Sequence, residues 1–225
     1  AARLSPLAGA IVANSRAGAA WHQARGYAAR RMVVIENGID TKAFAPDPAG
    51  RRRLRAAWGL AAAAPLVGLV GRLDPLKDIP GFLKAAARLA AEPPAARFVV
   101  VGGGPAAYRQ ELERLADGLG LAGRVLFAGE AREMAPVYSA LDLLVSASRT
   151  EGFSNVIAEA LACGVPAVVT RVGDSPRIVG EAGEAGEVVP PGDPAALAAG
   201  IRRLWARLAA PGAELALVAR RRIGR

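Results

Sequence analysis

Two glutamates flank a short turn in the stretch TEGFSNVIAEALACGVP, residues 150–166. Glu151 precedes the Gly-Phe-Ser-Asn turn, and Glu159 lies eight residues later on the helix predicted to follow. Ser154 or Asn155 can cap that helix, whose first N–H groups and positive dipole end favour phosphate. A carboxylate beside such a site is suited to accepting hydrogen bonds from hydroxyl groups, as in sugar binding. Either glutamate could instead be an ordinary solvated side chain.

Two cations lie in a second stretch, VGRLDPLKD, residues 70–78. A guanidinium fork at Arg72 and a flexible ammonium at Lys77 can together neutralise a diphosphate, although both could also be plain surface charges. Asp78 is explained as the N-cap of the next helix. In the first stretch, Gly152 would let a ligand approach the main chain closely. The two stretches together predict a pocket for a phosphorylated, hydroxyl-bearing ligand.

A glycine-rich stretch, FVVVGGGPAA, supports an alternative function. Gly102, Gly104 and Ala107 fit the G-x-G-x-x-A fingerprint of a dinucleotide fold, and Glu130 imitates its ribose-binding acid. However, the fingerprint normally occupies the first βα unit, and Glu130 follows Gly102 by 28 residues where about 20 are usual. A tight turn with Pro105 at the first helical position explains the same residues without a ligand. An NAD(P)-binding enzyme is therefore the second hypothesis.

The bulk composition limits the alternatives further. The chain has 225 residues, of which 52% are hydrophobic, enough for the core of one large or two small domains. No apolar run approaches the roughly 18 residues of a membrane span, and Ala1–Pro6 lacks the regions of a signal peptide. Cys163 is the single cysteine and His22 the single histidine. We expect a cytoplasmic globular protein with a packed thiol, a surface imidazole, no disulfide and no metal site.

The formal net charge of +9 favours an anionic partner: a nucleotide, a nucleic acid or a phospholipid surface. Arginines cluster at Arg51–Arg53 and Arg220–Arg222, where they fit either solvated helix faces or a peripheral contact with an anionic membrane. A nucleic-acid partner is not expected, because aromatic residues make up only 5% of the chain and none alternate with the basic ones.

Short apolar runs alternate with helical patterns from Leu66 onward, which predicts a βαβ series. Runs rich in valine and leucine indicate strands covered on both faces, so we expect an α/β fold with a Rossmann-like parallel sheet and helices on both faces. A ligand should bind at the loops that leave the strands' carboxyl ends. The predicted strands are Leu66–Val70, Phe98–Val101, Val125–Ala128, Leu143–Ser146, Ala167–Thr170 and Glu187–Val189; the helices are Ile79–Ala91, Ala106–Leu119, Ala135–Ala140, Asn155–Cys163 and Ala195–Leu208; the loops are Gly71–Asp78, Gly102–Pro105, Gly129–Glu133 and Ser148–Ser154.

The first 45 residues follow another pattern. GAIVANS predicts a strand that leads to an N-cap at Ser15, the next helix ends near Gly26, and MVVIENGID predicts a strand entering an Asn-Gly turn. FAPDPAG then forms a proline-rich break. One strand and one helix cannot bury a core alone, so we interpret residues 1–28 as the remnant of a preceding domain, 29–210 as a Rossmann-like domain and 211–225 as a basic tail.

The motifs in register resemble the carboxyl-terminal half of a retaining glycosyltransferase of family 4, with the GT-B fold. The resemblance runs from about Gly9 to Leu208, and within the family it is most similar to bacterial enzymes that build O-antigen and other surface polysaccharides. Where relatives commonly have glutamate after Gly-x-x-Pro, this chain has Arg177. In order, the motifs are ENGID, VGRLDPLKD, VVVGGGP, LFAGEARE, YSALDLLVSASRTEGFSNVIAEALACGVPAVVT and VVPPGDPAAL.

The resemblance implies that residues 29–210 bind a nucleotide sugar, and it assigns roles residue by residue. It implies that Arg72 and Lys77 hold the donor's diphosphate and stabilise the leaving group. Glu151 would contact the hydroxyls of the transferred sugar, and Glu159 would bind the ribose. The catalytic residues expected are therefore Arg72, Lys77 and Glu151. The donor-binding residues expected are Gly71, Arg72, Lys77, Glu130, Arg132, Glu151, Gly152, Phe153, Ser154, Asn155, Val156 and Glu159, with Glu130–Arg132 bordering the base.

No metal or cofactor is implied, because the cations and the helix dipole would meet the charge of the departing nucleotide. The donor would be a sugar nucleotide of the UDP or GDP type, and the acceptor a lipid-linked glycan. The family's amino-terminal domain, which supplies the acceptor site, is missing, so we expect this chain to fold and bind nucleotide weakly without transferring sugar. A GT-B epimerase or phosphorylase, and a non-catalytic binding module, stay open as further alternatives.

Overall fold

A computed structural model describes residues 1–90, 96–210 and 214–223. Most of the chain forms one six-stranded sheet in which every neighbouring pair is parallel. The strand order β5-β4-β3-β6-β7-β8 is that of a doubly wound nucleotide-binding sheet. The strands are β3 (Leu66–Val70), β4 (Arg97–Val101), β5 (Val125–Gly129), β6 (Leu143–Ser146), β7 (Ala167–Thr170) and β8 (Gly186–Val189).

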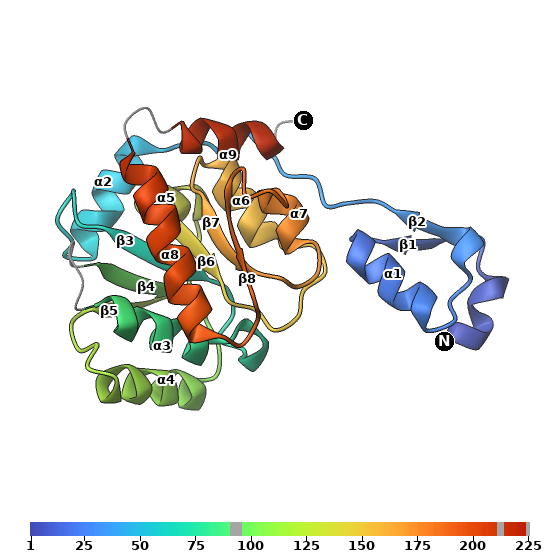
Figure 1. Cartoon of the computed structure of the whole chain (residues 1–225), viewed down its shortest axis with the longest axis horizontal. Helices are drawn as coiled ribbons and strands as arrows, with labels where there is room; N and C mark the ends of the chain where they lie inside the picture. Colours follow the sequence, from blue (N-terminus) through green and yellow to red (C-terminus); the bar gives the residue numbers. More distant parts are fainter. Residues whose placement is uncertain (91–95, 211–213, 224–225) are drawn as a thin grey trace.

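Helices cover both faces of this sheet (Figure 1). One core lies between the sheet and α3, α4 and α8, and a second core lies between the sheet and α5, α6, α7 and α9. The predicted α/β class is thereby confirmed. The helices of the first face are α3 (Ile79–Leu89), α4 (Ala106–Gly118) and α8 (Pro194–Ala209); those of the second are α2 (Pro48–Ala57), α5 (Met134–Ala140), α6 (Asn155–Ala162), α7 (Ser175–Val179) and α9 (Leu215–Ile223).

The first 34 residues form a separate small unit, here called the N-terminal segment (Figure 1). Its two strands pair in parallel, and an extended stretch, residues 35–40, leads from it to the sheet domain. Because the second strand pairs with the first, this sheet extends past the predicted division after residue 28. The elements are η1 (Ala2–Leu7), β1 (Ile11–Ala13), α1 (Arg16–Ala24), η2 (Ala29–Arg31) and β2 (Met32–Val34).

Several predictions of local structure need correction. The proline-rich break contains the start of α2, whose N-cap Asp47 accepts a hydrogen bond from the Gly50 amide. No turn forms at Asn37-Gly38, where the backbone is extended. Pro105 is the N-cap of α4 and not its first helical residue. Helix α7 was not predicted, because its five residues are too short for a periodic pattern.

The predicted basic tail is in its described part a packed helix, α9. Leu215 and Ala219 of α9 are buried, and Arg222 donates hydrogen bonds to the carbonyl oxygens of Ile178 and Arg177. Residues 211–213 and 224–225 of that predicted tail lie outside the described residues. The end of the chain therefore completes the second core.

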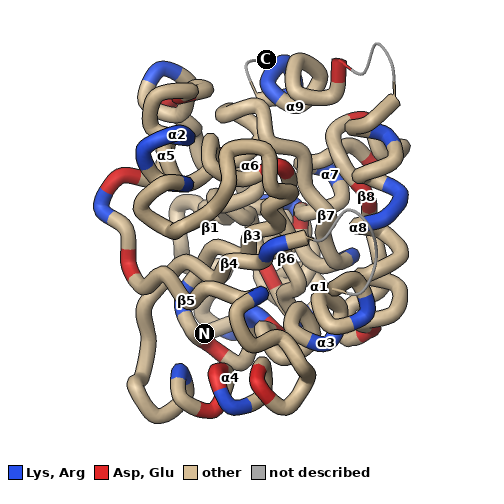
Figure 2. The backbone as a smooth tube through the Cα atoms, turned by 90° about the vertical axis from the view of Figure 1, so that its left-hand side faces the viewer, with Lys and Arg blue, Asp and Glu red and all other residues tan. Residues whose placement is uncertain are grey.

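Two of the arginines of α2 serve the fold, whereas Arg52 and Arg53 are exposed, as expected for a solvated helix face. Arg55 is almost fully buried and Arg51 half-buried, and both pair with Asp142, at 2.9 Å and 2.6 Å. Arg51 also donates to three carbonyl oxygens at the end of α5. Acidic and basic positions are interspersed on α4 in Figure 2, whereas α3 and α8 carry basic positions and no acidic ones. No helix in the described part of the chain is long and apolar enough to cross a bilayer.

Candidate active site

The site residues converge at the point where the strand order reverses. Strands β3 and β6 are neighbours in the centre of the sheet but lead to helices on opposite faces. The loops after β3 and β6 therefore leave the same edge side by side, which is where doubly wound sheets bind ligands. The amide of Arg149 donates to the carbonyl oxygen of Leu76 at 2.8 Å and ties the two loops together.

Lys77 and Glu151 meet across these loops. The Lys77 Nζ lies 2.5 Å from Glu151 Oε1, and the Ser148 hydroxyl donates to the same carboxylate oxygen at 2.8 Å. Both charged side chains are mostly buried, so the attraction between them is screened less than at an open surface. The structure thus brings together one predicted phosphate-binding cation and the predicted sugar-binding acid.

A small hollow of about 10 Å³ lies beside this pair. It has room for about one water molecule. The hollow is therefore too small for a diphosphate as it stands. The hollow is lined by Leu69, Val70, Lys77, Val145, Ser146, Ala147, Ser148, Glu151, Ser154 and Val156.

Helix α6 points its first turn at this hollow. It starts at Asn155 with Ser154 as N-cap, as predicted, but the Ser154 side chain makes no capping hydrogen bond. The Asn155 side chain also does not cap, because its Oδ1 accepts from Asn37 at 2.8 Å. The Phe153 side chain packs against the second core, so only the main chain of this residue can face the hollow. The positive end of the α6 dipole is therefore not neutralised by either predicted cap.

Glu159 lies one turn further along α6. Its Oε2 accepts a 2.6 Å hydrogen bond from the hydroxyl of Tyr138, a fully buried side chain of α5. Burial, followed by the hydrogen bond to Glu159 and that group's negative charge, raises the pKa of Tyr138 well above its usual range. The phenol therefore stays protonated and fixes the direction of the carboxylate.

The glycine-rich loop after β4 has a packing explanation. A Cβ at Gly102 would overlap the carbonyl oxygen of Gly71, and a Cβ at Gly104 would lie 2.6 Å from Cβ of Leu73. The Leu73 amide also donates to the Gly103 carbonyl at 2.7 Å. These glycines are needed where two main chains touch, so the fingerprint is explained without a dinucleotide.

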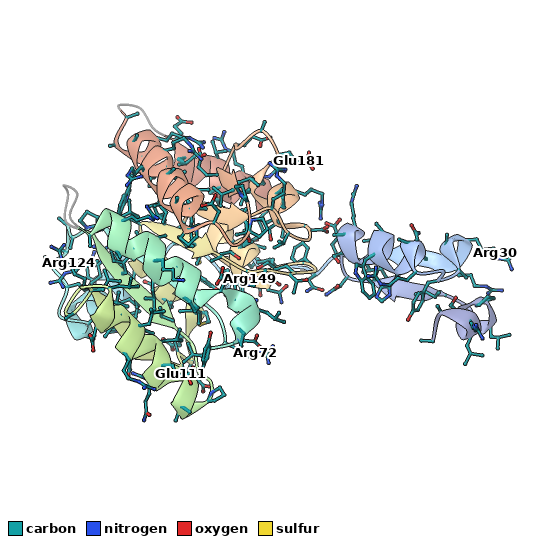
Figure 3. All side chains as sticks on the ribbon, turned by 60° about the horizontal axis from the view of Figure 1, so that its bottom comes forward. Arg30, Arg72, Glu111, Arg124, Arg149 and Glu181 are labelled. Carbon is teal, nitrogen blue, oxygen red and sulfur yellow. The ribbon has the colours of Figure 1, made fainter. Side chains whose placement is uncertain are left out.

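The remaining predicted residues lie at the edge of the site. The Arg72 side chain is 84% exposed, is 3.9 Å from Asp74, and projects from the end of its loop in Figure 3. Arg132 is exposed as well, and Glu130 lies against Gly103. The stem of Lys77 runs along Gly71. The structure thus gathers Lys77, Glu151 and α6 but not Arg72.

Sequence reasoning missed three residues of the site. Ser148 and Tyr138 bind the two predicted glutamates, and Asp174 lies under the Glu151 loop, where its amide donates to the Gly152 carbonyl at 3.0 Å. Ser148 could have been found from its place at the end of a strand. Tyr138 and Asp174 carry no such signal, because only the packing of α5 and of the loop after β7 brings them there.

Comparison with known proteins decides the family. Residues 64–207 match the family model described as glycosyl transferases group 1. The chain belongs to this glycosyltransferase family. The matched residues run from the start of β3 nearly to the end of α8 and include both central loops.

Curated relatives of this glycosyltransferase chain are similar over most of its length. A D-inositol 3-phosphate glycosyltransferase of Geodermatophilus obscurus is 40% identical over 79% of the chain and 41% of that protein. A GDP-mannose-dependent alpha-(1-6)-phosphatidylinositol monomannoside mannosyltransferase of Mycolicibacterium smegmatis is 38% identical over 68% of the chain and 41% of that protein. The chain thus spans about two fifths of the length of these relatives.

Solved structures agree with the assignment to this glycosyltransferase family. Anabaena HepE in complex with UDP has a TM-score of 0.87 and 28% identity, over 98% of this chain and 59% of that one. This similarity confirms the predicted Rossmann-like half of a GT-B fold, and an NAD(P)-binding enzyme is not favoured. Among the described residues, no group of three or more His, Cys, Asp and Glu side chains could hold a metal.

Proposed function

We propose that this chain is the donor-binding half of a retaining glycosyltransferase that uses a nucleoside diphosphate sugar of the UDP or GDP type. The observation that carries the proposal is the Lys77–Glu151 pair, held at the first turn of α6 where the sheet order reverses. One cation and one helix N-terminus suit a diphosphate, and one acid suits sugar hydroxyls. No metal or cofactor enters this proposal.

Donor binding would exchange one ion pair for two new sets of contacts. Lys77 would move from Glu151 to the diphosphate, and the freed carboxylate would accept hydrogen bonds from the sugar. Arg72, which is exposed without a donor, would turn inward to the same phosphates. These cations would stabilise the leaving diphosphate as its bond to the anomeric carbon of the sugar breaks. The acceptor oxygen would form the new bond to that carbon, and the acceptor's proton would pass to the leaving phosphate oxygen.

Relatives supply the basis for proposing a donor and an acceptor class. HepE is described in complex with UDP, and one curated relative is GDP-mannose-dependent, so both bases stay candidates. The two curated relatives described above are named for inositol-containing acceptors. We propose a polyol or glycolipid acceptor. The names of these relatives favour a phosphorylated inositol, and a surface-polysaccharide precursor such as O-antigen is the alternative. A peripheral contact with an anionic membrane would suit the glycolipid.

The test is calorimetric titration of UDP, GDP, ADP and NAD into the chain. We expect UDP or GDP to bind and NAD not to bind. Lys77→Met should weaken the better-bound nucleotide about tenfold to a hundredfold, because a charge-assisted hydrogen bond contributes about 1.5–3 kcal/mol. The matched control is Lys84→Met, an exposed lysine of α3, which should leave the affinity unchanged.

Two results would contradict the proposal. One is equal affinity of the wild type and Lys77→Met for every nucleoside diphosphate. The other is binding of NAD in preference to UDP and GDP, which would restore the second hypothesis. A non-catalytic binding module would be indicated if Glu151→Gln left the affinity for sugar nucleotides at the wild-type value.

A further inference from the structure

Helix α1 of the N-terminal segment is capped by a side chain of the sheet domain, Asp174 in the loop after β7. The amides of Arg16 and Ala17, the first two helical residues, each donate to one carboxylate oxygen of Asp174, both at 2.9 Å. The amide of Gly18 donates to the hydroxyl of Ser15, the local N-cap. Asp174 is 4% exposed, so the bonds form away from bulk water, where a carboxylate at a helix N-terminus is strongly favoured.

The same Asp174 supports the loop that carries Glu151. Its own amide donates to the Gly152 carbonyl at 3.0 Å. The preceding residue, Gly173, has φ +54 and lies so close that a Cβ there would overlap the carbonyl oxygens of Glu151 and Gly152. The Glu151 loop therefore rests directly on the main chain at residues 173–174.

Gly152 is also contacted from the side of the N-terminal segment. A Cβ at Gly152 would lie 3.3 Å from Ser15 Oγ and 3.6 Å from Asn14 Oδ1. This close approach gives Gly152 a second explanation beside access for a ligand. Three separate stretches, residues 14–17, 151–152 and 173–174, thus form one set of contacts.

We propose that Asp174 is a positioning residue that caps α1 and, through Gly152, sets the place of the Glu151 carboxylate. The docking of the N-terminal segment would then determine whether Glu151 stands beside Lys77. This role rests on the proposed function, because it matters for chemistry only if Glu151 binds the donor. Asp174 itself touches no donor and acts through the main chain.

A proline substitution removes one of the bonds, and it also forces the Asp174 carboxylate away because the proline Cδ takes the place of the donated hydrogen. In Arg16→Pro the amide that donates to Asp174 is lost, while a proline at the first helical position suits α1. Ser15, the preceding residue, already has φ −152 and ψ 149, the extended backbone that precedes proline without strain. The matched control is Arg16→Ala, which keeps the amide and removes only the side chain, including its 3.1 Å ion pair with Glu36.

The measurement is amide hydrogen exchange of residues 150–156 in the whole chain without ligand. We expect Arg16→Pro to speed exchange there about tenfold and Arg16→Ala to leave it near the wild-type rate. Asp174→Asn, which keeps the side-chain shape, should reproduce the effect of Arg16→Pro. Asp193→Ala removes a comparable local cap, on Ala195 and Ala196 of α8, and should leave the exchange of residues 150–156 unchanged.

The proposal would be overturned if the amides of residues 150–156 exchanged at equal rates in Arg16→Pro and Arg16→Ala. It would also be overturned if Asp174→Asn sped exchange in α1 but not in residues 150–156. Titration of UDP and GDP into the same wild-type sample separates the two hypotheses. If neither nucleotide binds but the loop responds to Arg16→Pro, the coupling stands and the donor assignment fails. If a nucleotide binds and the loop does not respond, only the role of Asp174 fails.

Discussion

At the scale of single residues, each of the two predicted donor-binding glutamates, Glu151 and Glu159, is held by a group from another part of the chain or loop. Lys77 and Ser148 hold Glu151, and Tyr138 holds Glu159. A carboxylate with one oxygen engaged presents the other in a fixed direction, which prepares it to bind a diol. The geometry of the two glutamates therefore depends on residues that spacing alone does not reveal.

Tyr138→Phe tests whether the orientation of the Glu159 carboxylate matters, because the variant keeps the carboxylate and loses the hydrogen bond that orients it. Losing the 2.6 Å hydrogen bond should cost about 1–3 kcal/mol of stability, because the partner carboxylate is partly buried. If Glu159 binds the ribose, the ratio of affinities for a nucleoside diphosphate and its 2′-deoxy analogue should move toward one. Calorimetry with both ligands gives that ratio, and an unchanged ratio would show that Tyr138 serves packing alone.

Cys163 provides a prediction with a defined pH range. Burial, and then the negative charge of Glu159, raise the pKa of this thiol from 9.0 to about 12. A raised pKa contributes stability that is complete below pH 9.0 and is lost as the pH rises toward about 12, because the unfolded chain ionises first. Cys163→Ala should therefore lose less stability than the wild type between these values, measured by urea unfolding.

The same burial should protect the thiol from reagents. At pH 8 the native protein should react slowly with a thiol-specific disulfide reagent, and the denatured protein at once. Cys163→Ala supplies the blank. Rapid stoichiometric reaction of the native protein would contradict the packed position of this side chain.

At the scale of elements, the contacts between loops explain the glycines better than a ligand does. Gly102→Ala should destabilise the protein by several kcal/mol, because the new Cβ would overlap the main chain at Gly71 and φ is +147. Gly118, in the last turn of α4, has nothing within 4 Å of its Cβ position. Gly118→Ala should therefore stabilise by about 0.5–1 kcal/mol. Thermal unfolding of both variants checks the opposite signs, and equal effects would contradict the packing explanation.

The strands of the central sheet could be predicted from the sequence, but the short or arginine-rich helices that flank it could not. Leu66–Val70, Leu143–Ser146 and Ala167–Thr170 were predicted with the observed bounds, because strands buried on both faces are continuous apolar runs between turn residues. Helices α2 and α9 were not predicted with bounds, although their arginine clusters were expected on solvated helix faces or at a membrane. In the structure, Arg55 and Arg222 bind carbonyl oxygens of distant segments, a contact that no local pattern encodes.

The site was predicted in part for the same reason. Lys77 and Glu151 follow central strands that are neighbours in the sheet, so parallel topology alone brings their loops together. Arg72 follows the same strand as Lys77 but lies on the open side of its loop, and only side-chain geometry distinguishes the two. The link to Asp174 could not be predicted, because it depends on where the N-terminal segment docks.

At the scale of the whole molecule, an ion-pair network joins the N-terminal segment to the sheet domain. Arg177 lies 2.8 Å from Glu36 and 3.3 Å from Asp174. Glu36 in turn binds Arg16 of α1. Burial alone would raise the pKa of Glu36, but the hydrogen bonds and charges of Arg177 and Arg16 outweigh it and lower that pKa. The cation at residue 177 is thus matched by an acid in the connecting stretch.

Charge reversal tests whether this network joins the two parts. Glu36→Arg and Arg177→Glu should each destabilise the protein, because each places like charges about 3 Å apart. The double variant restores an opposite pair between residues 36 and 177, so it should be more stable than the sum of the two single effects predicts, by about 0.5–3 kcal/mol.

The same network should depend on pH. Because the lowered pKa of Glu36 contributes stability above about pH 4.5 that is lost as the pH falls below that value, the wild-type coupling should fade in acid. Urea unfolding of the four proteins at pH 7 and at pH 3 measures both effects. Additive single effects at pH 7 would mean that Arg177 does not hold the N-terminal segment against the sheet domain.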